Sequence, residues 1–192
     1  RWDLARALAG SGRFDRAMEE ASLARNLLPG AVSDSALSEL YMGYGRSLIL
    51  QGQYDRAAEA FEEARRLKPR LDQAADMADL YEGRARAAKA SGNLAAAEKD
   101  YERALSLEPQ RWKARRELAA VYEQTGQYDK AIAELERTAE EGKDAAAIKE
   151  MARIYETYKG DGHKAIAAYR RYLATRPTVP DAAEVEKKIK AA

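Results

Sequence analysis

The sequence contains no cysteine, one histidine and two phenylalanines among its 192 residues. Because cysteine is absent, disulfide bonds, thiolate metal sites and cysteine nucleophiles are excluded. No stretch approaches the roughly 18 consecutive apolar residues of a membrane-spanning helix, and none reads as a signal peptide. We therefore expect no membrane span in this sequence.

An excess of charge of either sign is also lacking, because 33 basic residues face 32 acidic ones and the formal net charge is +1. Such a chain has no bulk attraction to nucleic acid or to an anionic membrane, so we expect no nucleic-acid partner. Apolar residues make up 46% of the sequence and charged residues 34%, which favours a folded helical protein over a disordered chain.

Residues that could carry out catalysis do not occur together. His163 lies in a polar turn with no second histidine to share a metal, so we expect a solvated turn residue. Gly10, Ser11 and Gly12 superficially resemble part of a phosphate loop, but no Gly-Lys-Ser/Thr follows them. No nucleophile, base and orienting group form a catalytic arrangement. We therefore predict that the protein is not an enzyme and has no cofactor or metal.

One segment, Gly52 to Pro69, recurs with changes along the chain. Gly52 can adopt the positive φ that ends a preceding helix, and Pro69 stops the helix that follows. Ala57, Phe61 and Ala64 recur at helical spacing and so lie on one face of that helix. The segment therefore predicts a turn followed by one amphipathic helix.

The copies of this segment are aligned by the alanine that follows each turn. This alanine recurs, at spacings of 40, 40, 34 and 34 residues, as Ala17, Ala57, Ala97, Ala131 and Ala165. Periods of this size mark arrays of helical repeats. Upstream of each turn, a second predicted helix has a small residue that allows close helix packing, at Ala5, Gly45, Ala85, Ala119 and Ala152.

The pattern of small residue, Gly-x-aromatic turn, alanine, aromatic, alanine and proline resembles the tetratricopeptide repeat family over nearly the whole chain, from about Trp2 to Pro177. The resemblance implies an all-α, right-handed α-solenoid of about five helix-turn-helix repeats. We expect a single array over residues 1–192, with repeats at about 1–30, 33–70, 72–110, 111–142 and 144–177 and a capping helix at 181–190. Because the first predicted helix has no start signal, we expect a truncated N-terminus.

Two of the periods are six residues longer than 34, which predicts a lengthened first helix in the second and third repeats. We expect these helices to run from about residue 33 or 34 to Leu50 and from about Asp72 to Ala90. They could project beyond the stack and line a deeper groove. Alternatively, the extra residues are insertions that a connection tolerates.

The resemblance implies a non-catalytic scaffold that binds a peptide or partner protein in a concave groove, lined by the first helix of each repeat. The ninth repeat position holds Arg6, Arg46, Arg86, Ala120 and Arg153. The expected peptide-binding residues are Arg6, Met42, Arg46, Glu82, Arg86, Lys89, Lys113, Arg116, Lys149 and Arg153. Their basic excess predicts an extended peptide of acidic character. Alternatively, each arginine pairs with a neighbouring acid, as Arg86 could with Glu82, and only solvates the groove.

Other functions stay open as hypotheses. The array could be a structural or self-assembling subunit of a larger complex, of the envelope or secretion type, and therefore a homo-oligomer. RNA binding by a related helical-repeat family is disfavoured by the proline-terminated second helices and the balanced charge. Capture of a chaperone C-terminus is disfavoured because the positions of its asparagines and lysines hold Trp2, Arg6 and Gly43. Cytoplasm and bacterial periplasm are both compatible with the sequence.

Overall fold

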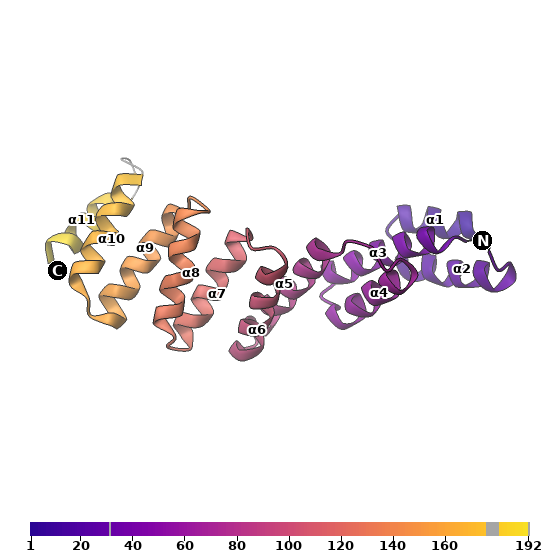
Figure 1. Cartoon of the computed structure of the whole chain (residues 1–192), viewed down its shortest axis with the longest axis horizontal. Helices are drawn as coiled ribbons and strands as arrows, with labels where there is room; N and C mark the ends of the chain where they lie inside the picture. The colour runs from indigo at the N-terminus through magenta and orange to yellow at the C-terminus, as the bar shows by residue number, and fades with distance from the viewer. Residues whose placement is uncertain (31, 176–180, 192) are drawn as a thin grey trace. The chain divides into compact units, whose positions relative to one another are not determined.

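The computed structural model describes residues 1–30, 32–175 and 181–191, and every secondary-structure element in these residues is a helix (Figure 1). The predicted all-α class is therefore confirmed. The helices are α1 (Trp2–Gly10), α2 (Phe14–Leu27), α3 (Asp34–Leu50), α4 (Tyr54–Leu67), α5 (Ala74–Ala90), α6 (Leu94–Leu107), α7 (Trp112–Gln124), α8 (Tyr128–Glu140), α9 (Ala145–Ile154), η1 (Tyr155–Lys159), α10 (Gly162–Thr175) and α11 (Ala182–Ala191).

The helices pack as antiparallel pairs, as the repeat pattern predicts: α1 with α2, α3 with α4, α7 with α8, and α9 with α10. The alanines that align the copies, such as Ala57 and Ala131, are fully buried. The glycine of each turn adopts the positive φ expected of it. At Gly52, for example, φ is +73° and the amide donates a hydrogen bond to the carbonyl oxygen of Ile49 at 2.9 Å. The turn therefore closes α3 and reverses the chain into α4.

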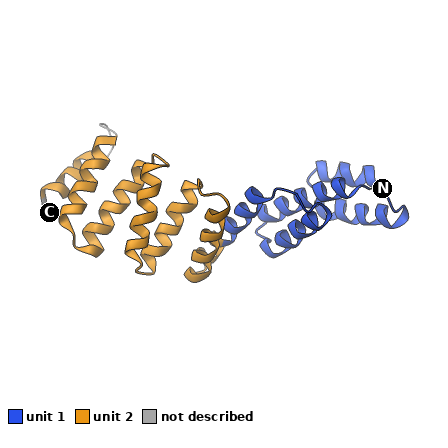
Figure 2. Ribbon diagram, in the orientation of Figure 1, with its two compact units in different colours: residues 1–84 blue, residues 85–192 orange. Residues whose placement is uncertain are grey.

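The chain divides into two compact units, Arg1–Arg84 and Ala85–Ala192 (Figure 2). In the first unit, one cluster of buried side chains includes Ala5, Ala17 and Leu37, and another includes Phe61 and Leu80. The second unit has one larger cluster, described next. The boundaries of five repeats within one continuous array stay a prediction.

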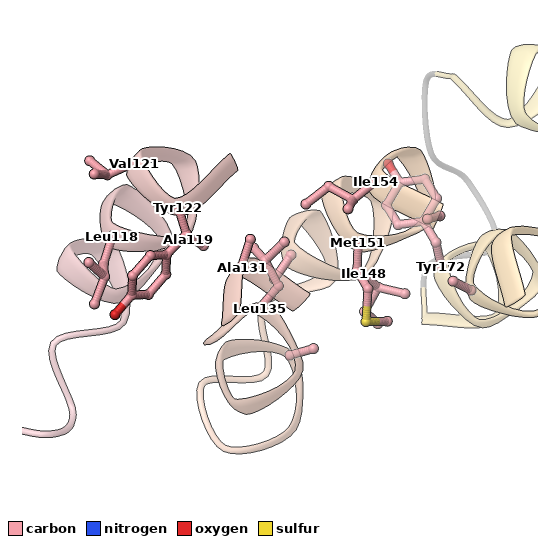
Figure 3. Close-up of a cluster of buried hydrophobic side chains, with 14 of the residues drawn as sticks. Leu118, Ala119, Val121, Tyr122, Ala131, Leu135, Ile148, Met151, Ile154 and Tyr172 are labelled. Carbon is pink, nitrogen blue, oxygen red and sulfur yellow. The ribbon is translucent and has the colours of Figure 1, made fainter. Parts of the chain in front are cut away.

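The core of the second unit is built from side chains of successive helices. Leu118 from α7, Leu135 from α8 and Met151 from α9 are each at most 4% exposed, and Figure 3 shows side chains of these three helices meeting. Ala119 and Ala152 occupy the predicted close-packing positions and are 1% and 0% exposed. Burial of apolar surface between neighbouring helix pairs is what stabilises an array of this kind.

The two lengthened helices form as predicted, because α3 and α5 each have 17 residues. Ser33 caps α3 by accepting a hydrogen bond from the Ala36 amide at 3.2 Å. The added turn of α3 buries Leu37 and Ser38, and the Ser38 hydroxyl donates to the carbonyl oxygen of Ala64 at 2.9 Å. The start of α3 is therefore packed against α4 rather than projecting from it.

The fifth copy contains one residue more than the others between the small residue of its first helix and the glycine of its turn. Ala152 and Gly160 are eight positions apart, whereas Ala119 and Gly126 are seven apart. The structure accommodates the additional residue as the π-helical segment η1 between α9 and α10. A π-turn of this kind inserts one residue without ending the helix.

The predicted capping helix is α11, which packs on α10. Val185 of α11 is 1% exposed and belongs to the core cluster of the second unit. The predicted boundary at Pro177, the neighbouring Pro180 and the loop residue Ala31 lie outside the described residues.

Candidate functional site

A hollow of about 480 Å³ opens in the second unit, and we call it the Ala120 hollow. Side chains from α5, α7, α8 and α9 line it. They are Lys89, Lys113, Arg116, Glu117, Ala119, Ala120, Glu123, Leu135, Glu150 and Arg153. Four of the ten predicted groove residues therefore come together here: Lys89, Lys113, Arg116 and Arg153.

Most bases of the Ala120 hollow are hydrogen-bonded to an acid on a neighbouring first helix. Lys89 Nζ donates to Glu117 Oε2 at 2.8 Å, which links α5 to α7. Arg153 of α9 donates to Glu123 of α7. These pairs agree with the alternative prediction, in which the bases of the groove are neutralised by acids. The partner is on the adjacent first helix, however, and not one turn away on the same helix. We call the residues at the ninth repeat position the basic column, namely Arg6, Arg46, Arg86, Ala120 and Arg153.

Arg116 is held by two acids. Its Nη1 atom is 3.1 Å from Asp144 Oδ2, and its Nη2 atom donates to Glu150. The hydrogen bond to Glu150 is the main cause that raises the pKa of Arg116, and the bond to Glu123 does the same for Arg153. Both guanidinium groups are therefore positively charged at any accessible pH. The Nε atom of Arg116 is buried and has no hydrogen-bond acceptor among the described residues.

Lys113 differs from the other bases of the Ala120 hollow. Its side chain is exposed, and within residues 1–30, 32–175 and 181–191 it forms no ion pair. With four bases and three acids in the lining, the hollow has an excess of one positive charge. Lys113 carries that excess, because the other three bases each face an acid of the lining.

One further predicted residue, Lys149, is found near the cap. Lys149 and Arg153 line a second hollow of about 380 Å³ together with Tyr169 and Lys188, and we call it the cap hollow. Lys149 Nζ donates to Asp181, and this hydrogen bond raises the pKa of Lys149. Lys149 is therefore engaged in holding the start of α11.

In the first unit, Arg6 lines a hollow of about 460 Å³ beside Trp2 and Phe14. Arg46 donates from Nε to Asp76 Oδ1 at 2.5 Å and from Nη2 to Asp76 Oδ2 at 3.0 Å. This bidentate bond links α3 to α5 and raises the pKa of Arg46. As in the second unit, an arginine of the column is paired with an acid on an adjacent first helix.

The structure places Met42 in the core, which corrects its assignment to the groove. Met42 is 5% exposed, packs in the cluster of Phe61 and Leu80, and receives a hydrogen bond from Gln73 Nε2 to its sulfur at 3.2 Å. The remaining two predicted residues lie on α5, where Glu82 is half-buried and Arg86 is exposed.

Sequence reasoning missed the acids that hold the groove bases. These partners are Asp76, Glu117, Asp144, Glu150 and Asp181. Each of them is 28 to 34 positions from its base. A separation close to one repeat period was the signal that could have found them, because such residues face each other on adjacent first helices.

No helix among the described residues is long and apolar enough to cross a membrane, and these residues contain no group of three histidine, aspartate or glutamate side chains placed to hold a metal ion.

Models of the tetratricopeptide repeat family match residues 38–71, 84–155 and 147–183. The chain is a tetratricopeptide repeat protein. Members of this family generally mediate protein–protein interaction and are typically non-catalytic. No curated protein matches the sequence at a significant level.

Solved tetratricopeptide repeat and related structures share the fold at low sequence identity. The crystal structure of MamA is 22% identical with a TM-score of 0.55, covering 92% of this chain and 96% of MamA. YrrB, described as a TPR protein with an unusual peptide-binding site, is 20% identical with a TM-score of 0.56, covering 97% and 90%. The C-terminal part of a TPR protein from Cytophaga hutchinsonii is 14% identical with a TM-score of 0.55, covering 100% and 72%.

Proposed function

We propose that this tetratricopeptide repeat protein is a non-catalytic scaffold that binds a peptide or partner protein of acidic character, with the Ala120 hollow as the principal contact. The observation that supports this most is the charge of the hollow, where Lys113 has no ion-pair partner within the described residues while the neighbouring bases have one. The description of YrrB as a peptide-binding protein is consistent with it.

The paired bases remain available to a ligand. The side chains of Arg116 and Glu150 are 34% and 36% exposed, and those of Lys89 and Glu117 are 23% and 48% exposed. Ion pairs this accessible contribute only about 0–1 kcal/mol each. A carboxylate of the ligand can therefore replace a glutamate at little net cost, because it offers the base the same charged oxygen acceptors.

The proposal is tested by measuring peptide affinity by fluorescence anisotropy with labelled twelve-residue peptides of acidic, neutral and basic composition. The acidic peptide is expected to bind best. Its affinity is expected to fall as the salt concentration increases from about 50 to about 300 mM, because screening weakens the electrostatic attraction. Lys113→Ala is expected to weaken acidic-peptide binding about three- to tenfold.

The matched control is Lys99→Ala, which removes an exposed lysine of α6 that lines none of the three hollows described above. It is expected to leave the affinity unchanged. Equal binding of all three peptides, or equal losses in the two lysine variants, would contradict the proposal.

Self-assembly is a second candidate, and the surface of α2 favours it. Leu23, Leu27 and Leu28 are 44%, 71% and 64% exposed. The position of Leu23 is charged in the four other copies, at Glu63, Arg103, Arg137 and Arg171. Light scattering of the wild type and of Leu27→Lys over a range of concentrations tests it, with Leu107→Lys at the same position of the third copy as control. A wild type that stays monomeric throughout would exclude self-assembly.

A further inference from the structure

We propose that the Ala120 hollow is an anchor subsite that takes one large apolar side chain of the ligand, with carboxylates flanking that side chain. This inference rests on the proposed function and makes it more specific. The floor of the hollow would bind the apolar side chain, and the rim would bind the carboxylates.

The Ala120 hollow has a small residue where the other copies have an arginine of the basic column. Ala120 occupies the position that is arginine in the four other copies, at Arg6, Arg46, Arg86 and Arg153. An arginine at position 120 would extend a long side chain over the surface that Ala120 leaves open. The small side chain at position 120 therefore leaves room inside a hollow of about 480 Å³, a size that suits a ligand group.

The floor of the hollow is apolar. Ala119, Ala120 and Leu135 contribute methyl and methylene groups, and Ala120 is the most exposed of the three, because Ala119 and Leu135 are each 1% exposed. Their side chains have no hydrogen-bond donor or acceptor. A polar ligand group placed there would lose its water without replacement, whereas an apolar side chain gains by leaving water. The floor therefore selects an apolar anchor.

The rim of the hollow has basic side chains that can pair with acidic residues of the ligand. Lys113 has no acid partner within the part of the chain that the structure describes, so one carboxylate of the ligand can pair with it without displacing anything. Arg116 has a buried Nε atom that lacks an acceptor there. A second carboxylate beside Arg116 can compete with Glu150 for the same guanidinium group. Acidic residues on both sides of the anchor fit this distribution of charge.

The test compares two acidic twelve-residue peptides that differ only at the centre, where one has leucine and the other has serine. The wild type is expected to bind the leucine peptide about tenfold more tightly, which corresponds to burial of part of one leucine side chain. Isothermal titration calorimetry provides the affinity and the heat-capacity change, which is expected to be more negative for the leucine peptide.

Two substitutions fill the hollow. Ala120→Arg introduces the residue that the column has in the other repeats, and Ala120→Leu fills the same space without adding charge. Both are expected to abolish the preference for leucine over serine. Ala120→Leu is also expected to keep the preference for acidic over basic peptides. Ala133→Arg, at an exposed alanine of α8 that does not line the hollow, is the matched control and is expected to bind like the wild type.

The outcomes separate this inference from the proposed function. If acidic peptides bind and the leucine and serine peptides bind equally, the anchor subsite is refuted while the acidic groove stands. If the preference for leucine survives in both Ala120 variants, the anchor is not in this hollow. If no acidic peptide binds at all, the proposed function fails as well. Urea unfolding of each variant establishes that the change in binding is not a change in folding.

Discussion

Tyr128 stacks on Tyr158, with ring centroids 4.6 Å apart and ring planes inclined by 11°. Tyr128 is the aromatic residue of the fourth turn, and Tyr158 belongs to η1, the π-helical segment that accommodates the additional residue. In the first repeat the turn aromatic Phe14 lies against Gly43 and stacks more loosely on Tyr44, with ring centroids 6.5 Å apart. The fourth turn therefore contacts the next first helix through a closer stack, with a ring supplied by the π-helical segment.

We expect the stack to contribute to the stability of the second unit. Aromatic pairs contribute about 0.5–1.5 kcal/mol beyond their buried area. A double-mutant cycle with Tyr128→Leu and Tyr158→Leu, measured by urea denaturation, is expected to give a coupling energy in that range. Strictly additive effects of the two substitutions would show that the rings do not interact in solution.

Gly83 is expected to be intolerant of a side chain. A Cβ atom at this position would lie 2.6 Å from Cε1 of Tyr54, so the ring would have to move. We expect Gly83→Ala to lower the free energy of unfolding by about 1–2 kcal/mol, within the usual range for overpacking. Gly10→Ala is the control, because nothing lies within 4 Å of its Cβ position, and it is expected to be neutral or stabilising. Equal effects would contradict the close packing of Tyr54.

Attachment of α11 is expected to depend on pH through Asp181 and Glu156. Asp181 accepts hydrogen bonds from Lys149 and from the Tyr172 hydroxyl, and the bond from Lys149 is the main cause that lowers the pKa of Asp181. Glu156 accepts from Lys188 at 2.8 Å and from the Tyr169 hydroxyl at 2.6 Å, and the bond from Lys188 is the main cause that lowers the pKa of Glu156.

A carboxyl group whose pKa is lowered by folding stabilises the folded state above its ordinary pKa, near 4, and this contribution is lost as the pH falls through the lowered value. Hydrogen exchange of the α11 amides, corrected for the intrinsic rate, is therefore expected to show full protection at pH 6 and reduced protection below about pH 4. Lys188→Met is expected to reduce the protection already at pH 6. Protection that does not change between pH 6 and pH 3 would argue against these contacts.

The arginines of the column are expected to differ from Lys113 in their effect on binding. Arg46 is engaged by Asp76, so Arg46→Met is expected to change acidic-peptide affinity by less than about twofold. The same substitution is expected to lower stability by about 0.5–1 kcal/mol, because Asp76 is 13% exposed and would lose its partner. Peptide titration of this variant alongside Lys113→Ala checks the affinity, and urea denaturation checks the stability. A tenfold loss of binding in Arg46→Met would restore the arginine column as the contact surface.

Much of the fold could be predicted because it depends on short-range patterns. Ala17, Ala57 and Ala131 set the repeat period, Gly52 ends a helix, and Ser33 starts one. Each of these features is determined by backbone conformation or by the period of one helix. The lengthened α3 and α5 followed from the additional six residues in two of the periods.

The site was less predictable because it depends on how neighbouring repeats meet. The groove position assigned to Met42 turned out to be buried, since Met42 packs in the cluster of Phe61 and Leu80 and Gln73 lies against its sulfur. The hydrogen bond between Lys89 and Glu117 depends on the rotamers of two side chains on different helices. The π-turn did leave a trace in the sequence, namely the eight-residue interval from Ala152 to Gly160, but an interval alone does not indicate where Tyr158 will point.

The cross-helix ion pairs place the acid and the base of each pair in different repeats. Arg46 comes from the second copy and Asp76 from the third, while Glu123 comes from the fourth and Arg153 from the fifth. A gene rearrangement that deleted, duplicated or exchanged one copy would separate such partners and leave unmatched charges at both new junctions. The order of the copies is thus fixed by which charges face each other across neighbouring repeats. We expect this protein to tolerate substitutions within a copy more readily than rearrangement of whole copies.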